Sequence, residues 1–341
     1  MALLLLKDDN ARLPPLPGNL FSVAPKHRTD AIMTTAIYTH PDCQRHEMGE
    51  WHPESPARLQ AIDDQLIRSR IDDFIQHREA PLATIEHLAR IHNRQAIALV
   101  QDNLPAPNEY YPLDGDTSLN QYSWQAALRA AGAAVAATDA VIAGEIDNAF
   151  CSIRPPGHHA RPCEPMGFCL FNNVAIAARH ALDVHGLERV AIVDFDVHHG
   201  NGTAEAFANE PRVLMVSFFQ HPFYPYSGAN GPQAANQVNV PVPAQADGRA
   251  IRQVMWDKWL PALHAHQPQM LFISAGFDAH REDDIGGMAL VEADYAWMTE
   301  QIMLVAAKYA KGRIVSCLEG GYNLSALGRS VAAHIKVLAE L

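Results

Sequence analysis

The segment Arg-Val-Ala-Ile-Val-Asp-Phe-Asp-Val-His-His-Gly, residues 189–200, joins a short apolar run to several groups that bind metals. Residues 190–193 are continuously apolar, which is typical of a parallel strand buried on both faces. Asp194, Asp196 and His198 alternate along the chain, so in an extended backbone their side chains point to the same side. Burying three such groups is costly unless a cation holds them, and Asp oxygen and His nitrogen are both zinc ligands. We predict a metal site here; a solvated loop after a strand is the alternative.

Similar apolar runs alternate with helical stretches along the rest of the chain. The predicted strands cover residues 35–38, 148–153, 190–195, 213–217, 270–275 and 313–317. The predicted helices cover residues 56–69, 120–143, 172–185, 249–266, 292–310 and 325–340. Strands separated by helices predict an α/β fold, with a central, mostly parallel sheet flanked by helices on both faces. Ligands bind beyond the carboxyl ends of the strands in such sheets, and the polar segments of this chain fall there.

The size and charge of the chain limit what it binds. Its 341 residues, 48% of them hydrophobic, suit one large α/β domain or two modest ones. The formal charge of −12 argues against a direct nucleic-acid partner and suits cationic or neutral partners such as lysine-rich peptides or polyamines. The five cysteines form no C-x-x-C pair, which predicts a reducing compartment and a cytoplasmic location. A homo-oligomer is compatible with the sequence.

The N-terminal residues differ in character from the rest of the chain. Residues 1–32 contain prolines at positions 14, 15, 17 and 25 and show no periodic pattern, so we predict an N-terminal extension followed by a single domain over residues 33–341. The apolar residues 3–6 are followed at once by charged residues and are too few for a signal-peptide core. No run approaches eighteen consecutive apolar residues, so we expect no membrane-spanning helix.

Two further strand ends carry metal-binding or acid–base groups. His158 and His159 follow a Pro-Pro-Gly turn, which suits two imidazoles held in fixed positions, although a surface loop is the ordinary alternative. Asp278 ends the segment Leu-Phe-Ile-Ser-Ala-Gly-Phe-Asp, residues 271–278, where it could complete a three-ligand metal site with an open position. The alternative for Asp278 is a cap on the next helix.

Aromatic residues follow two other turns. In Cys-Leu-Glu-Gly-Gly-Tyr-Asn, residues 317–323, Gly320 and Gly321 allow the backbone to pass close to a ligand and aim Tyr322 into a cleft. A tyrosine hydroxyl there can donate to a developing oxyanion, and a packed core tyrosine is the alternative. Phe168, within Gly-Phe-Cys at residues 167–169, either lines a slot or belongs to the core.

Taken in order, these segments resemble the zinc-dependent histone deacetylase family, and most closely its class II-like and bacterial amidohydrolase branch. The resemblance rests on Arg-Pro-Pro-Gly-His-His (154–159), Gly-Phe-Cys (167–169), Asp-Phe-Asp-Val-His-His-Gly-Asn-Gly-Thr (194–203), Ala-Gly-Phe-Asp (275–278) and Leu-Glu-Gly-Gly-Tyr (318–322). The earlier segment 52–59 also matches, and the likeness runs from about Ile37 through His334. It implies an arginase/deacetylase-like fold and makes residues 33–341 a deacetylase catalytic domain.

The resemblance also implies the roles of individual residues. A zinc ion is expected on Asp196, His198 and Asp278. The expected catalytic residues are His158, His159, Tyr322, Asp194, which orients His158, and Asn201, the partner of His159. Several family members carry Asp in place of Asn201, and a neutral amide stabilises imidazolium less than a carboxylate does. Potassium binding is implied near residues 194–198 and the Ser217 hydroxyl.

For the substrate, the resemblance implies a narrow acyl-lysine slot. Phe168 forms one wall, and the other wall falls on Phe223 or Tyr224, of which Tyr224 is our assignment. Asp116 matches a rim carboxylate that grips the substrate backbone, and Gly320 borders the ligand. Ile285 stands at the gatekeeper position, where relatives that prefer polyamines carry an acid. The implied substrate is therefore acetyl-lysine in a protein or peptide, or a small acetylated amine.

Three alternatives remain open beside this hypothesis. Acetylpolyamine hydrolysis uses the same chemistry, and acids at positions 282–284 lie near Ile285. A binuclear manganese hydrolase of the arginase type needs bridging carboxylates, but the later motif reads Asp278-Ala279-His280 and offers none. A binding module without activity should have lost a ligand, a histidine or the tyrosine, and all of these positions are filled.

Overall fold

A computed structural model describes residues 33–230 and 233–341 of the chain. The main strands are β1 (Thr35–Thr39), β2 (Gln76–Glu79), β5 (Asn148–Cys151), β6 (Val190–Asp194), β7 (Val213–Gln220), β8 (Gln237–Val242), β9 (Leu271–Ala275) and β10 (Ile314–Leu318). They form one eight-stranded sheet in the order β2-β1-β5-β10-β9-β6-β7-β8, and every neighbouring pair is parallel. The predicted α/β fold with a parallel sheet is confirmed.

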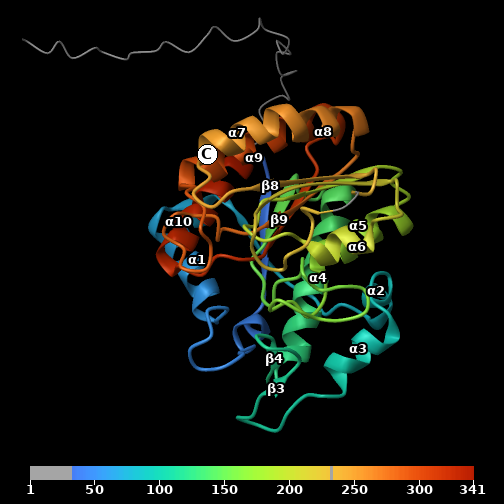
Figure 1. Cartoon of the computed structure of the whole chain (residues 1–341), viewed down its shortest axis with the longest axis vertical. Helices are drawn as coiled ribbons and strands as arrows, with labels where there is room; N and C mark the ends of the chain where they lie inside the picture. The colour runs from blue at the N-terminus through green and yellow to red at the C-terminus, as the bar shows by residue number, and fades with distance from the viewer. Residues whose placement is uncertain (1–32, 231–232) are drawn as a thin grey trace, which may run out of the picture. The chain divides into compact units, whose positions relative to one another are not determined.

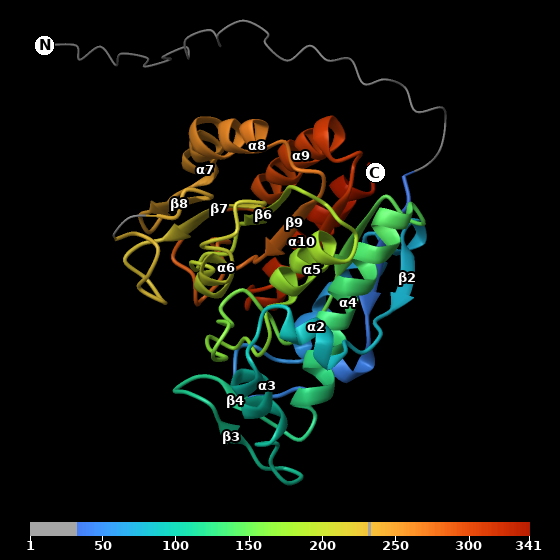
Figure 2. The same ribbon diagram turned by 90° about the vertical axis from the view of Figure 1, so that its right-hand side faces the viewer.

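Helices cover both faces of this sheet (Figures 1 and 2). On one face lie α4 (Ser123–Ala143), α5 (Asn173–Asp183) and α6 (Asn201–Ala206). On the other lie α1 (Ala57–Arg68), α7 (Gly248–Val254), α8 (Leu260–His266), α9 (Glu292–Tyr309) and α10 (Leu324–Leu338). This division follows from right-handed crossovers, because connections that move in opposite directions along the sheet place their helices on opposite faces.

A smaller layer lies beyond one end of the sheet. It contains α2 (Ile85–Ala89), α3 (Arg94–Gln101) and the short antiparallel pair β3 (Tyr111–Pro112) and β4 (Ser118–Leu119). In Figure 2 these elements lie below the sheet, around the lower end of α4. The predicted helix 249–266 is present as α7 and α8, joined by a π-helical turn at Met255–Trp259.

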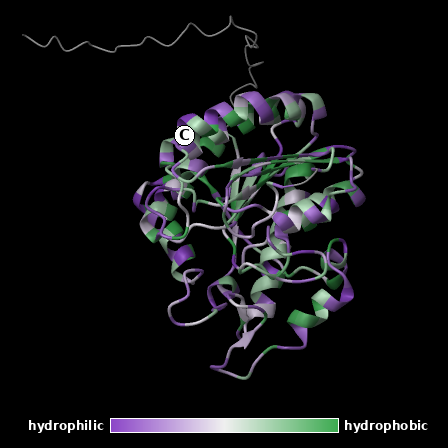
Figure 3. Ribbon diagram, in the orientation of Figure 1, coloured by the Kyte–Doolittle hydropathy of each residue, from purple (hydrophilic) through white to green (hydrophobic). Residues whose placement is uncertain are grey.

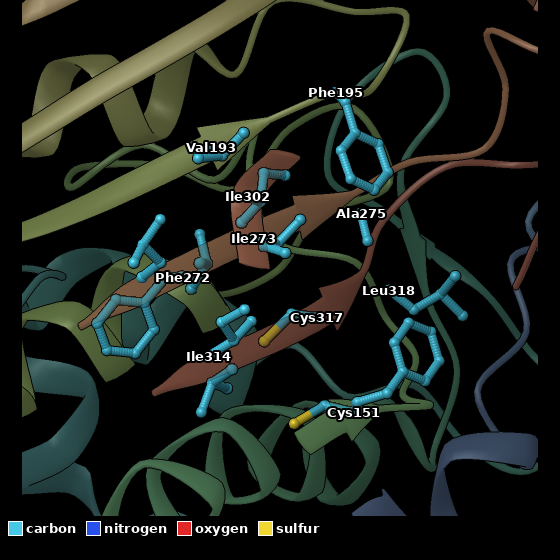
Figure 4. Close-up of a cluster of buried hydrophobic side chains, with 14 of the residues drawn as sticks. Cys151, Val193, Phe195, Phe272, Ile273, Ala275, Ile302, Ile314, Cys317 and Leu318 are labelled. Atoms are coloured by element: carbon cyan, nitrogen blue, oxygen red, sulfur yellow. The ribbon is translucent and has the colours of Figure 1, made fainter. Parts of the chain in front are cut away.

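The core lies between the central strands and the helices packed on them. β5, β6, β9 and β10 are buried throughout, and their apolar side chains, among them Phe272, Ile273 and Ile314, meet in Figure 4. Figure 3 shows the strands mostly in hydrophobic colours and the outer helix surfaces in mixed ones, as expected when each helix turns one stripe inward. The four cysteines at positions 43, 151, 169 and 317 are buried, Cys163 is exposed, and all five are free thiols.

Helix α4 is long and apolar enough, by length and composition, to span a bilayer, and within the described residues it is the one helix of that kind. Its most apolar window is 72% buried inside the fold, where it packs against α5 and the sheet. The alanine-rich character of the helix is therefore explained by close packing. The predicted extension at residues 1–32 lies outside the described residues.

Candidate active site

The segment after β6 meets the ends of β9 and β10 at the carboxyl edge of the sheet. Asp196, His198 and Asp278 are buried there, and one ligand atom from each lies within 4.8 Å of the others. His198 Nδ1 lies 2.9 Å from Asp196 Oδ1 and 3.2 Å from Asp278 Oδ2. The structure thus brings the three predicted metal ligands together, although 80 residues separate His198 from Asp278.

Backbone groups fix both carboxylates of this triad. Asp196 Oδ2 accepts from the Gly320 amide at 2.9 Å, and Asp278 Oδ1 accepts from the Val197 amide at 3.0 Å. A Cβ atom on Gly276 would lie 2.0 Å from Asp196 Oδ2, and one on Gly320 would lie 2.0 Å from Asp278 Oδ2. Only glycine permits this close approach of two strand ends to the carboxylates.

The triad suits a divalent zinc ion. Asp278 Oδ2 is buried and faces the His198 nitrogen at 3.2 Å with no well-formed hydrogen bond, so it keeps acceptor capacity for a cation. Burial and the charge of Asp196 raise the pKa of Asp278 to about 6, which shows the cost of holding two carboxylates here without a cation. Two carboxylates and one imidazole are a zinc donor set that leaves a coordination position open.

Two histidines border the triad, each with its own partner. His158 Nδ1 lies 3.0 Å from Asp194 Oδ2, and His159 Nδ1 lies 2.7 Å from Asn201 Oδ1. Both partner atoms are acceptors, so each imidazole carries a proton on Nδ1, and Nε2 is the acceptor nitrogen wherever the ring is neutral. His158 Nε2 lies 3.7 Å from Asp196 Oδ1, and the rings of the two histidines are 4.1 Å apart.

The two histidines differ in basicity because their partners differ. Burial lowers the pKa of His158, but the charges of Asp196 and Asp194 raise it well above the ordinary value overall. Burial lowers the pKa of His159 well below the ordinary value, and the neighbouring imidazoles of His158 and His198 lower it further. The neutral amide of Asn201 offers His159 no compensating charge.

Aromatic rings surround the approach to these histidines. The Phe168 ring meets the Tyr322 ring edge to face at 5.8 Å and the His52 ring at 4.6 Å. The Phe168 backbone has φ of +67°, and its amide donates to Thr117 Oγ1 at 3.0 Å. Phe168 is therefore held in an unusual conformation by Thr117 and faces the predicted tyrosine.

Both residues predicted for the second wall, Phe223 and Tyr224, face histidines of the site. Phe223 stacks on His198 with ring centroids 5.2 Å apart, while Tyr224 meets His159 edge to face at the same separation. A Cβ atom on Gly167 would lie 2.9 Å from the Tyr224 hydroxyl oxygen, so Tyr224 also faces the loop that carries Phe168. The structure thus places Tyr224 beside His159 and the loop that carries Phe168, and Phe223 against His198 of the triad.

The predicted rim residues lie on two separate loops. Asp116 is exposed in the β3–β4 turn, and its carbonyl accepts from His52 Nε2 at 3.0 Å. Ile285 is partly buried, and its amide donates to Asp283 Oδ1 at 3.0 Å. Asp283 Oδ2 in turn accepts from the amides of Tyr322, at 2.6 Å, and Asn323, at 3.0 Å.

The comparisons with known proteins agree with this arrangement. The profile of the histone deacetylase domain matches residues 52–338 of the chain.

The chain belongs to the histone deacetylase family.

Relatives within the family come from bacteria, archaea and plants. The chain is 38% identical to the histone deacetylase-like amidohydrolase of Pseudomonas aeruginosa, covering 80% of this chain and 73% of that protein. It is 36% identical to a probable deacetylase of Archaeoglobus fulgidus, covering 86% of this chain and 82% of that protein. It is 34% identical to type-2 histone deacetylase 2 of Dictyostelium discoideum, of which it spans only 21%. The crystal structure of the HDA15 HD domain aligns with a TM-score of 0.83 and 34% identity, covering 91% of this chain and 89% of that one.

Membership in the histone deacetylase family makes the chain a hydrolase with deacetylase or amidohydrolase activity. The predicted resemblance and fold are confirmed. The arginase-type alternative lacks ligands, because His280 turns away from the triad: its Nδ1 accepts from the Glu282 amide and its Nε2 lies 3.6 Å from Glu292. Within the described residues, no second metal-binding group adjoins the first.

Sequence reasoning did not identify two carboxylates that support the site in this deacetylase family member. Glu319 Oε2 accepts from the amides of Gly157 and His158 at 2.6 and 3.0 Å, and its Oε1 accepts from Ser274 at 3.1 Å. Asp283 holds the Tyr322 backbone, although the sequence placed it only among rim acids. Both residues act through backbone amides, and such contacts leave no residue pattern in a single sequence.

A buried ionic network lies behind Tyr322. Glu54 receives hydrogen bonds from Arg58 and Arg154, and all three side chains are fully buried. Arg58 also donates to the carbonyls of Gly321, at 2.7 Å, and Glu319. Arg58 therefore holds the turn that carries Tyr322.

Proposed function

We propose that this chain removes acetyl groups from lysine side chains of proteins or peptides, with a zinc ion held by Asp196, His198 and Asp278. The observation that carries the proposal is the buried triad, in which Asp278 Oδ2 keeps acceptor capacity for a cation, beside His159, whose Nδ1 donates to Asn201 and whose Nε2 can take a proton. When bound, zinc supplies Lewis-acid polarisation of the acyl carbonyl and activation of water.

The protein's own groups supply the proton transfers. His159 carries its proton on Nδ1, bonded to Asn201, so its Nε2 accepts a proton from the attacking water and passes it to the departing amine nitrogen. His158 donates from Nδ1 to Asp194, and the charges of Asp196 and Asp194 favour its protonated form, which adds positive charge beside the site. The Tyr322 hydroxyl donates a hydrogen bond to the developing oxyanion.

The slot accounts for the substrate class. The Phe168 ring lies against Tyr322 and the Tyr224 ring against His159, and aromatic walls of this kind suit an extended, uncharged acyl-lysine stem. Of the acids beside Ile285, Asp283 already accepts three backbone amides and Glu282 pairs with Arg329 at 2.8 Å. An ammonium group next to Ile285 therefore meets only the exposed Asp284. We infer a preference for acetyl-lysine peptides over acetylpolyamines.

The decisive measurement compares kcat/KM for an acetyl-lysine peptide and for acetylputrescine, with and without a zinc chelator. The peptide should be the better substrate, and the chelator should abolish both activities until zinc is restored. Ile285→Glu should shift the ratio toward acetylputrescine, because a carboxylate at the gatekeeper position pairs with the distant ammonium.

Ile285→Gln is the matched control for this substitution, since glutamine has the size of glutamate but carries no charge. It should leave the ratio of the two substrates close to that of the wild type. A wild-type protein that hydrolyses acetylputrescine faster than the peptide would overturn the substrate assignment while leaving the metal assignment in place. Activity that persists in the fully demetallated protein would overturn the zinc assignment.

Two further properties are proposals of the same kind. A potassium ion is proposed beside Asp194 and Ser217, where the Ser217 hydroxyl now donates to Asn239 Oδ1 at 2.8 Å. A cytoplasmic location is supported by the five free thiols, four of them buried.

A further inference from the structure

A second group of metal-binding side chains lies on the outer face of the molecule, where α4 packs against α5. Asp139 Oδ1 is 2.7 Å from His180 Nε2 and 2.6 Å from His185 Nε2. The three ligand atoms all lie within 4.8 Å of one another. One carboxylate oxygen is thus shared by two imidazole nitrogens, and the catalytic residues take no part in this cluster.

Three different pieces of backbone bring these groups together. Asp139 is on α4, and His180 is on the last turns of α5. His185 follows the helix end, since Val184 is the C-cap, so its side chain can turn back toward His180 despite a spacing of five residues. The two imidazole rings meet edge to face at 5.3 Å, and a third imidazole, His87 of α2, packs against His180 at 5.5 Å.

The exposure of the three groups suits an ion that enters from solvent. The side chain of Asp139 is 51% exposed and that of His185 is 24% exposed, while that of His180 is only 6% exposed. His180 anchors the cluster, and the other two can move slightly outward. Burial raises the pKa of Asp139, but hydrogen bonds from His180 and His185 lower it overall, so the carboxylate is ionised and available as a ligand.

The donor set selects the class of ion. Two imidazoles and one carboxylate suit Zn²⁺, Co²⁺, Ni²⁺ or Cu²⁺, whereas Mg²⁺ and Ca²⁺ prefer oxygen ligands alone. Tetrahedral zinc with bonds of about 2.0–2.1 Å needs its ligand atoms about 3.3 Å apart. The present separations of 2.6 and 2.7 Å must therefore widen by roughly 0.7 Å, which two partly exposed side chains allow through small rotations.

We propose that Asp139, His180 and His185 form a second binding site for a divalent transition-metal ion, which clamps the C-terminal end of α5 to α4. Water completes the coordination on the exposed side. The 11 residues of α5 span about 16 Å. At the opposite end of this helix, Asn173 donates to the Pro155 carbonyl at 3.1 Å and so supports the loop that carries the catalytic histidines. The clamp therefore stabilises a helix on which the active site depends.

Metal stoichiometry tests the proposal without reference to catalysis. Tag-free full-length protein is stripped with a chelator, dialysed against buffered free Zn²⁺ and analysed for bound zinc by mass spectrometry. Wild-type protein should bind two equivalents, and His185→Gln and Asp278→Ala should each bind one. The double variant should bind none. His77→Gln, which removes an exposed imidazole paired at 2.7 Å with a single carboxylate, should retain two equivalents.

The thermal melt of the same proteins supplies a second measurement. Zn²⁺ should raise the Tm of Asp278→Ala, whose only remaining site is the outer one, and should leave the Tm of the double variant unchanged. With Co²⁺, Asp278→Ala should show a d–d absorption band that the additional His185→Gln substitution removes. Circular dichroism of His185→Gln should match that of the wild type.

Two results would overturn the proposal. One is a single zinc equivalent in the wild type with none in Asp278→Ala. The other is two equivalents in both His185→Gln and Asp139→Asn, since either substitution removes a required ligand. Either outcome would leave Asp139, His180 and His185 as a hydrogen-bonded cluster and would not bear on the catalytic zinc.

Discussion

Tyr322 is fixed from three directions before any substrate arrives. Its amide donates to Asp283, its ring meets Phe168, and the Arg58 guanidinium lies 5.0 Å from the ring centroid. Burial raises the pKa of Tyr322 well above the ordinary value, and the charge of Asp278 adds to the shift. The hydroxyl therefore keeps its proton at neutral pH, as the proposed oxyanion donor must.

Tyr322→Phe should lower kcat by about 100- to 1000-fold, the usual loss when one oxyanion donor is removed. KM should change little, because the hydrogen bond forms mainly in the transition state. Steady-state kinetics on an acetyl-lysine peptide separates the two constants.

Tyr224→Phe is the matched control, since it removes a hydroxyl from the slot wall without touching the Tyr322 side chain. It should retain kcat within a few-fold of the wild type. Near-normal kcat in Tyr322→Phe would exclude the proposed role of the hydroxyl.

At this scale the sequence predicted the groups that carry chemistry better than those that hold them. Asp196 and His198 alternate on one extended segment, so their common direction follows from the pleat of a strand. Asp278 required the further rule that neighbouring strands end at the same edge. Asp283 could not be assigned, because a run of three acids does not show which one turns toward backbone amides.

Among the structural elements, the loop from β5 to α5 bears most directly on the site. It carries His158 and His159, and its backbone depends on Glu319 at the end of β10. Burial raises the pKa of Glu319 to about 7, and the two amides that it accepts oppose that shift. The loop and the strand end are thus connected by one buried side chain.

Glu319→Ala should lower the free energy of unfolding by about 2–6 kcal/mol, because two buried amides lose their acceptor at a cost of about 1–3 kcal/mol each. It should also lower kcat, since the loop that carries both catalytic histidines loses its support. Urea denaturation measures the first effect and single-substrate kinetics the second.

Glu319→Gln is the informative comparison. One amide oxygen can still accept from Gly157 and His158, while the new NH₂ group can donate to Ser274. This variant should recover most of the stability and activity. Equal losses in both variants would mean that the charge of Glu319, and not its hydrogen bonds, supports the loop.

The central strands could be predicted from the sequence, whereas the edge strands and the short helices could not. Six of the eight sheet strands contain short apolar runs that are visible in the sequence. β2 reads Gln-His-Arg-Glu and lies at one sheet edge, and β8 contains Pro241 and lies at the other, so neither carries a buried-strand pattern. α2 and α3 are too short for a clear helical period.

Across the whole molecule, several histidines are buried in their neutral form. His334 joins three elements: its Nδ1 pairs with Thr299 at 2.7 Å and its Nε2 with Ser316 at 3.0 Å. The rings of Phe150, Phe195 and Phe277 surround it. Burial lowers the pKa of His334 to about 3.

The folded protein should therefore lose stability as the pH falls. Below about pH 6.5 the unfolded chain binds a proton at His334 that the folded chain excludes. This difference in proton binding persists down to the folded pKa of about 3. The contribution of His334 to the free energy of unfolding is fully present above about pH 6.5. It is lost as the pH falls, at a limiting slope of about 1.4 kcal/mol per pH unit.

His334→Gln isolates this contribution, because glutamine can offer hydrogen-bonding groups to both hydroxyls but does not titrate. Its free energy of unfolding at pH 7 should be lower than that of the wild type, and it should fall less steeply between pH 6.5 and pH 4. Urea unfolding across this range measures both slopes. If the wild type and His334→Gln lost stability equally steeply, His334 would take up its proton at the same pH in the folded protein as in the unfolded chain.

The connection between the Gly320 amide and Asp196 spans 124 residues, and every strand pair of the main sheet is parallel. Parallel pairing and contacts of this separation form late in folding, because long loops must close first. We therefore expect the proposed zinc ligands to come together only after the rate-limiting barrier. Zinc should slow unfolding and leave the refolding rate unchanged, so that the metal governs how long a folded molecule lasts and not how quickly it forms.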